Sequence, residues 1–115
     1  MTEGPTEVNV EERSNFRKEI SMYGTIARFR VKPGMAEQFL AFVQREREDP
    51  GQVAEYFYRL DTDPNTYYMV VVFESKAAYV ANAQRPETHA RYSRGLEYLA
   101  SEPEWHDGEI VFTIT

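Results

Sequence analysis

The amino-acid sequence predicts an α+β domain in which an antiparallel four-stranded sheet carries helices on one face. The first observation is residues 67–73, a run of apolar and aromatic residues that is rich in valine and too short for a helix, so it predicts a strand. Both faces of this strand are apolar, because apolar or aromatic residues occupy its even-numbered positions as well as its odd-numbered ones. The second observation is the order of elements, which runs strand, helix, strand twice along the chain. The central strand therefore has to lie between two layers.

Length and composition predict one soluble domain. The 115 residues suffice for one core, and we expect a polar N-terminal extension at residues 1–20 and the folded domain at residues 21–115. The absence of cysteine, of a membrane-spanning apolar run and of an apolar signal-type N-terminus favours a cytoplasmic location and no membrane partner. The net charge of -6 disfavours a nucleic-acid partner.

Changes in periodicity mark the first strand, helix and strand. Residues 22–31 alternate between a more apolar and a mixed face, which predicts a strand, and the LysProGly that follows ends it. Residues 35–48 place apolar side chains at helical spacing. AspProGly at 49–51 breaks this helix, and residues 53–60 alternate again as a second strand.

The second half begins at the central strand, which the turn at residues 61–65 joins to the preceding strand as a hairpin. Ser75 is a good N-cap for the alanine-rich helix that follows. Pro86 must interrupt this helix and suits the first position of the next one, which we expect to continue to Ala100. Residues 105–108 are expected to form a loop, and the alternating residues 109–115 a final strand.

Two strand–helix–strand units with right-handed crossovers give the ferredoxin-like βαββαβ arrangement, with both helical segments on one face of the sheet. The other face would then be an apolar surface larger than soluble monomers usually expose. The same face of a second copy could cover this apolar surface. We therefore expect a homodimer in which the two sheets pack face to face.

Three segments carry a family resemblance: ArgPheArgValLysProGlyMet from Arg28, AspProGlyGlnValAlaGluTyrPheTyrArgLeu from Asp49, and ValPheGluSerLysAlaAlaTyr from Val72. In order and spacing the chain from Tyr23 to Thr115 resembles the antibiotic biosynthesis monooxygenase domain. The resemblance implies a dimeric α/β barrel. It also implies that the relatives include cofactor-free oxygenases of quinols and anthrone-like polyphenols, and haem-degrading proteins.

The haem-degrading branch fits poorly. The resemblance aligns Asn82 with a tryptophan that is frequent on the second helix in both branches, Ala27 with an asparagine of the haem branch, and Arg91 with its haem-ligating histidine. His89 lies two residues before Arg91, which is about 200° around a helix, so we expect that the two side chains cannot face one pocket. Haem is therefore disfavoured, and neither a metal nor another cofactor is expected.

The oxygenase interpretation requires three features of the site. These are a base that ionises a phenol, hydrogen-bond donors that stabilise the resulting oxyanion, and an apolar cavity in which dioxygen can react without water. Histidine is the residue type whose ordinary pKa suits the base near neutrality. The predicted catalytic residues are His89 as base with Asn82 and Tyr92 as donors, and the predicted substrate-binding residues are Tyr23, Thr25, Phe39, Phe73 and Leu96.

The sequence thus predicts a cofactor-independent monooxygenase that oxidises a small aromatic polyphenol, quinol or polyketide-type molecule with O2. The alternative is a non-catalytic small-ligand-binding or stress-associated dimeric α/β barrel, which the missing second-helix tryptophan favours. For His89 the alternative is a half-buried histidine bonded to a backbone carbonyl, and for Trp105 it is packing at the sheet edge.

Overall fold

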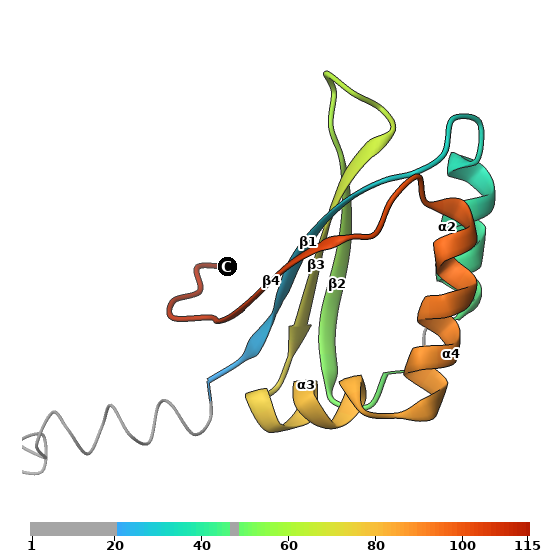
Figure 1. The fold of residues 1–115 in the computed structure, drawn as a ribbon. Coiled ribbons are helices and arrows are strands. Elements are labelled where there is room, and N and C mark those ends of the chain that lie inside the picture. Colours follow the sequence, from blue (N-terminus) through green and yellow to red (C-terminus); the bar gives the residue numbers. More distant parts are fainter. Residues whose placement is uncertain (1–20, 47–48) are drawn as a thin grey trace, which may run out of the picture.

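The computed structural model describes residues 21–46 and 49–115, so the expected extension at residues 1–20 lies outside the described residues. The elements are β1 (Tyr23–Arg30), α2 (Ala36–Arg45), β2 (Gln52–Arg59), β3 (Thr66–Phe73), α3 (Lys76–Ala83), α4 (Pro86–Gly95), the short 3-10 helix η2 (Leu96–Tyr98) and β4 (Glu104–Glu109). Their order and the antiparallel sheet confirm the ferredoxin-like α+β fold. In Figure 1, α2 and α4 run beside each other along one face of the sheet, and α3 crosses one end of it.

The sheet has the strand order β2-β3-β1-β4, so β3, the strand with the most apolar sequence, is central. In the register, Thr25 lies opposite Val71 and Asp107, and Ile26 lies opposite Val70 and His106. Because side chains alternate between faces, Thr25, Val71 and Asp107 share the helix-covered face, while Ile26, Val70 and His106 share the other.

Two predicted helix boundaries are confirmed. The Ser75 hydroxyl accepts a hydrogen bond from the Ala78 backbone N–H at 3.1 Å and so caps α3. Arg85 is extended, with φ -74° and ψ 135°, and Pro86 starts α4, as the sequence predicts for a residue that precedes proline. The break turns the chain between α3 and α4 and lets both helices contact the same pocket.

The core lies between α2 and the sheet, and it is aromatic. The rings of Phe29 and Tyr67 stack with their centroids 5.7 Å apart, and Phe39 from α2 meets them edge-on at 5.4 and 6.0 Å. Each ring buries a large apolar area, so this cluster fixes the distance between α2 and the sheet.

The final strand differs from the prediction. It spans Glu104–Glu109, while residues 110–115 have no regular structure and run away from the helices (Figure 1). The alternating apolar residues of this tail face solvent, since Val111, Phe112 and Ile114 are 76%, 77% and 83% exposed. Residues 105–108, expected to be a loop, form the strand instead, because backbone pairing with β1 and the inward side chains of Trp105 and Asp107 outweigh the low strand propensity of the segment.

Candidate functional site

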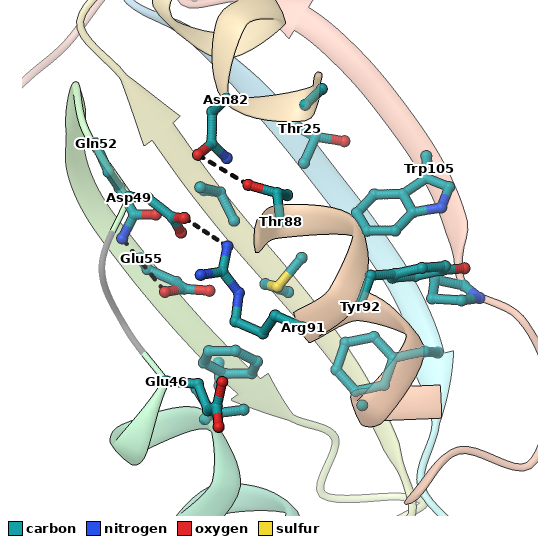
Figure 2. Close-up of a pocket in the computed structure, with 18 of the residues that line it drawn as sticks. Thr25, Glu46, Asp49, Gln52, Glu55, Asn82, Thr88, Arg91, Tyr92 and Trp105 are labelled. Carbon is teal, nitrogen blue, oxygen red and sulfur yellow. Dashed lines mark hydrogen bonds and ion pairs between the residues drawn. The ribbon is translucent and has the colours of Figure 1, made fainter. Parts of the chain in front are cut away.

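A cavity of about 450 Å³ lies between the sheet and the helices. Figure 2 shows strands behind it and α3 and α4 beside it. Its wall is mainly apolar, formed by Phe29, Phe39, Phe42, Phe57, Met69, Val71, Phe73, Tyr92, Leu99 and Trp105. Polar and charged side chains interrupt this wall, among them Thr25, Asp49, Asn82 and Arg91. An apolar wall with polar groups that can orient a ligand is typical of a pocket for a small organic molecule.

Asn82 on α3 is one of these polar groups. The residue is 9% exposed, and its Oδ1 accepts hydrogen bonds from the Thr88 hydroxyl at 3.2 Å and from Arg85 Nη1 at 3.4 Å. A guanidinium can only donate, so the Asn82 carbonyl oxygen must face Arg85 and the amide nitrogen must face the other way. Figure 2 shows this nitrogen on the side of Thr25, so Asn82 offers the pocket an N–H donor.

Tyr79 also lines the pocket, one helical turn before Asn82. Its hydroxyl donates to Asp107 Oδ1 on β4 at 2.8 Å. Burial, and then the bond to Asp107, raise the pKa of Tyr79 to about 12. The tyrosine therefore stays protonated across the physiological range and cannot serve as a base.

An ion pair closes the side of the pocket next to β2. Arg91 Nη2 on α4 lies 2.5 Å from Asp49 Oδ1, and the two side chains are only 20% and 12% exposed. Arg94 and Glu46 form a second ion pair between α4 and α2. These contacts hold α4 to the end of α2 and to the start of β2, so they keep the pocket wall together.

His89 and Arg91 both line this pocket, so the expectation that they cannot face one pocket is wrong. Neighbouring positions of a helix point in different directions, and the cavity lining includes residues on more than one side of α4. Arg91 reaches Asp49 beside β2, whereas Tyr92, one residue on, packs on Trp105 of β4 with the ring centroids 5.9 Å apart. His89 itself is exposed.

Most of the predicted site residues meet at this cavity. Those that line it are Thr25, Phe39, Phe73, Asn82, His89 and Tyr92. Tyr23 and Leu96 do not line it: Tyr23 packs on Tyr79 with the ring centroids 5.3 Å apart, and Leu96 begins the 3-10 helix after α4.

Sequence reasoning missed Tyr79, Trp105 and the Asp49–Arg91 pair as pocket residues. The three-residue spacing of Tyr79 and Asn82 could have indicated a shared helix face. Nothing local could have paired Arg91 with Asp49, which lies 42 residues away.

Within residues 21–46 and 49–115, no group of three or more histidine, cysteine or acidic side chains could hold a metal ion. None of the helices in this part of the chain is long and apolar enough to cross a bilayer. Burial, followed by the charge of Glu102, raises the pKa of Tyr92, which makes its hydroxyl a donor rather than a base.

Fold and pocket together define a small α+β domain with a mainly apolar cavity between its helices and its sheet. Residues 22–94 match the family model of the antibiotic biosynthesis monooxygenases. The chain therefore belongs to the antibiotic biosynthesis monooxygenase family.

Individual relatives agree with this assignment at the level of fold. A structure from Chloroflexus aurantiacus assigned to the same family is 23% identical, with a TM-score of 0.69, over 83% of this chain and 98% of that one. SnoaB from Streptomyces nogalater, a cofactor-independent oxygenase solved as a variant, is 18% identical, with a TM-score of 0.70, over 82% and 97%.

A sequence relative, the uncharacterized protein sll1783 of Synechocystis, is 29% identical over 79 residues, which cover 65% of this chain. The match spans 54% of that protein, about half its length.

Proposed function

We propose that the protein is a cofactor-independent monooxygenase that oxidises a small aromatic polyphenol, quinol or polyketide-type molecule with O2. The observation that carries the proposal is the Asn82 amide, held by Thr88 and Arg85 so that its N–H faces an apolar pocket. A fixed donor in a water-poor site is what a phenolate oxygen requires, because it stabilises the negative charge without having to reorganise. Membership of the family supports the same reaction class.

His89 is the proposed base, because it lines the pocket and is the residue type that accepts a proton near neutral pH. The phenol gives its proton to the imidazole, and Asn82 holds the resulting phenolate. The electron-rich anion then reduces O2, one oxygen atom joins the ring carbon, and the other leaves as water. For a dihydroxynaphthalene this gives a hydroxynaphthoquinone, and the ligand itself supplies all of the electrons.

The alternative is a ligand-binding protein of the same fold without chemistry. The exposure of His89 favours it, since among the described residues no hydrogen bond or ion pair positions the His89 ring. A general base whose side chain is not held in position accelerates proton transfer little more than water does.

Oxygen uptake separates the two functions. The purified protein is incubated with 1,4-dihydroxynaphthalene and related quinols, with a chelator present, and the rate is compared with that of uncatalysed oxidation. We expect uptake above background that persists with the chelator, and His89→Ala should lower turnover by about 10² to 10⁴ fold. Ser93→Ala is the control, because Ser93 is an exposed residue of the same helix that does not line the pocket. No uptake across the panel, or full activity in His89→Ala, would favour the binding protein.

We also infer that two copies pair through the sheet faces that lack helices. On this face Ile26, Tyr56 and Tyr58 are 48%, 63% and 62% exposed, and Val70 and Val72 are half-buried between them. The face also carries Arg28 directly opposite Glu104, so a two-fold axis through it can bring opposite charges together. An apolar sheet face of this kind is typical of a buried interface.

A further inference from the structure

Arg91 has hydrogen-bond donors that the described part of the chain does not use. A guanidinium carries five N–H groups, and among the described residues the Arg91 side chain makes one hydrogen bond, from Nη2 to Asp49 Oδ1 at 2.5 Å. The side chain is only 20% exposed, yet none of its other nitrogens is a buried atom without a partner. Because Arg91 lines the cavity, these N–H groups remain accessible to a molecule bound there.

The positive charge of Arg91 is already compensated by the Asp49 carboxylate. Within the described residues, the cavity lining adds the acids Glu46 and Glu55 but no second arginine and no lysine. A carboxylate of a ligand would therefore meet acidic side chains at this place, whereas an uncharged oxygen can accept from the guanidinium without adding negative charge. A donor left unpaired in a mainly apolar wall is unfavourable, so Arg91 favours a ligand that brings such an oxygen.

We infer that Arg91, held by Asp49, is a specificity-determining residue that donates to an uncharged oxygen of the aromatic ligand, such as a carbonyl oxygen, on the β2 side of the pocket. This inference rests on the proposed function, because it places the phenol group of the same ligand at Asn82. The function of Asp49 is then to hold the guanidinium in position and to cancel its charge, so that the pocket rejects aromatic carboxylates.

Asn82 and Arg91 act on different sides of the pocket. The amide nitrogen of Asn82 faces Thr25 of β1, whereas Arg91 reaches Asp49 beside β2 (Figure 2). β3 lies between these two strands, and neighbouring strands are about 4.8 Å apart, so two strand spacings, about 10 Å, separate the two sides. The preferred ligand should therefore carry its phenol and its second oxygen at opposite ends of the ring system rather than on neighbouring carbons.

The test is the ratio of the affinities for 6-acetyl-2-naphthol and 6-isopropyl-2-naphthol, measured by calorimetry at neutral pH under nitrogen. The two probes have nearly the same shape and share the naphthol hydroxyl, but only the first has a carbonyl oxygen. The wild-type protein should bind the ketone about tenfold more tightly, the effect of one hydrogen bond from a charged donor.

A double variant of the ion pair removes the donors without leaving an unpaired charge. Asp49→Asn combined with Arg91→Met should bring the ratio close to one. Arg94→Met is the matched control, because Arg94 lies on the same helix, forms an ion pair with Glu46 and does not line the cavity. This control should keep the wild-type ratio, since any loosening of α4 would weaken the binding of both probes alike.

Asp49→Asn alone tests the role of the compensating charge. The asparagine keeps an oxygen that accepts from Arg91, but the positive charge of the guanidinium is no longer cancelled. The probe is 6-hydroxy-2-naphthoate, which the wild-type protein should bind more weakly than 6-acetyl-2-naphthol. Asp49→Asn should bind this carboxylate about tenfold more tightly than the wild type does. Asp61→Asn, which removes the same charge from an exposed position of the β2–β3 turn, should leave its affinity unchanged.

Equal wild-type affinities for the ketone and its hydrocarbon counterpart, no binding of either, or an equal loss of the ratio in Arg94→Met would each overturn the inference. An unchanged ratio in the folded double variant would do the same. Should the double variant not fold, Asp49→Asn decides, because no gain in affinity for the naphthoate contradicts the inference. Binding under nitrogen needs no turnover, so the two proposals can fail separately. A selective pocket with no oxygen uptake contradicts the monooxygenase, whereas uptake without selectivity contradicts the role of Arg91.

Discussion

At Asn82, two donors hold an uncharged amide in one orientation. A substitution that keeps the accepting oxygen can therefore test the role of the N–H donor alone. Asn82→Asp keeps an oxygen that accepts from Thr88 and Arg85, but it replaces the N–H donor with negative charge. We expect the kcat/KM for quinol oxidation to fall by about 10² to 10³ fold, the usual loss for one oxyanion donor. Gln84→Glu, which adds the same charge to an exposed position next to α3, should leave the rate unchanged.

Tyr79 provides a prediction about alkaline pH. Its folded pKa of about 12 lies above the ordinary tyrosine value of 10.0, so the native state holds this proton after the unfolded state has lost it. The contribution of Tyr79 to stability is therefore complete below pH 10.0 and is lost as the pH rises toward about 12. Titration of tyrosinate absorbance should show a late-ionising group that is missing in Tyr79→Phe. A late phase of equal size in both proteins would show that Tyr79 is not that group.

At the scale of elements, β1 must approach β3 closely to place Thr25 in the pocket. A Cβ built on Gly24 would lie 1.8 Å from the Val71 carbonyl oxygen, and Gly24 is paired with Gly108, where a Cβ would meet nothing within 4 Å. Gly24→Ala should therefore lower the free energy of unfolding by about 1–3 kcal/mol or more, as overpacking against backbone does. Gly108→Ala should be neutral or slightly stabilising. Chemical denaturation measures both, and equal effects of the two substitutions would contradict the close approach of the strands.

Elements whose residues interact locally could be predicted from the sequence. The Ser75 cap, the break at Pro86 and the period of the central strand all depend on neighbours along the chain, and each is found in the structure. The position of β4 could not be predicted, because its strand pairing with β1 is long-range and its sequence is polar. The apolar alternation of residues 110–115 was the stronger local signal, yet that segment is exposed in the single chain.

The same distinction applies to the site. Phe39 and Tyr92 could be selected because each lies on a helix face whose direction follows from the 3.6-residue period. Asn82 could be selected because the family resemblance aligns it with a frequent tryptophan of the second helix. The pairs Tyr79–Asp107 and Arg91–Asp49 join residues that are 28 and 42 positions apart, so the tertiary fold alone brings them together.

For the whole molecule, the proposed pairing of two copies depends on the sheet face without helices. Val70→Glu would place one carboxylate on this face, among Ile26, Tyr56 and Tyr58, at the centre of the proposed interface. A charge buried there without a partner is unfavourable, so the variant should dissociate to monomers while circular dichroism shows a retained fold. Sedimentation velocity at micromolar concentration should give a dimer for the wild type. A wild-type monomer, or a Val70→Glu dimer of equal strength, would contradict sheet-to-sheet pairing.

If the pocket inserts one atom of O2 into an ionised aromatic ligand, that atom must be found in the product, so isotope incorporation tests the proposed reaction. The protein and 1,4-dihydroxynaphthalene are mixed under ¹⁸O2 with chelator present, the reaction is quenched early, and the product is analysed by mass spectrometry beside a His89→Ala reaction. We predict a hydroxynaphthoquinone that carries one heavy oxygen atom and that forms much faster with the wild-type protein. A product that carries no heavy oxygen, or one that forms equally fast without the protein, would rule out the proposed monooxygenase activity.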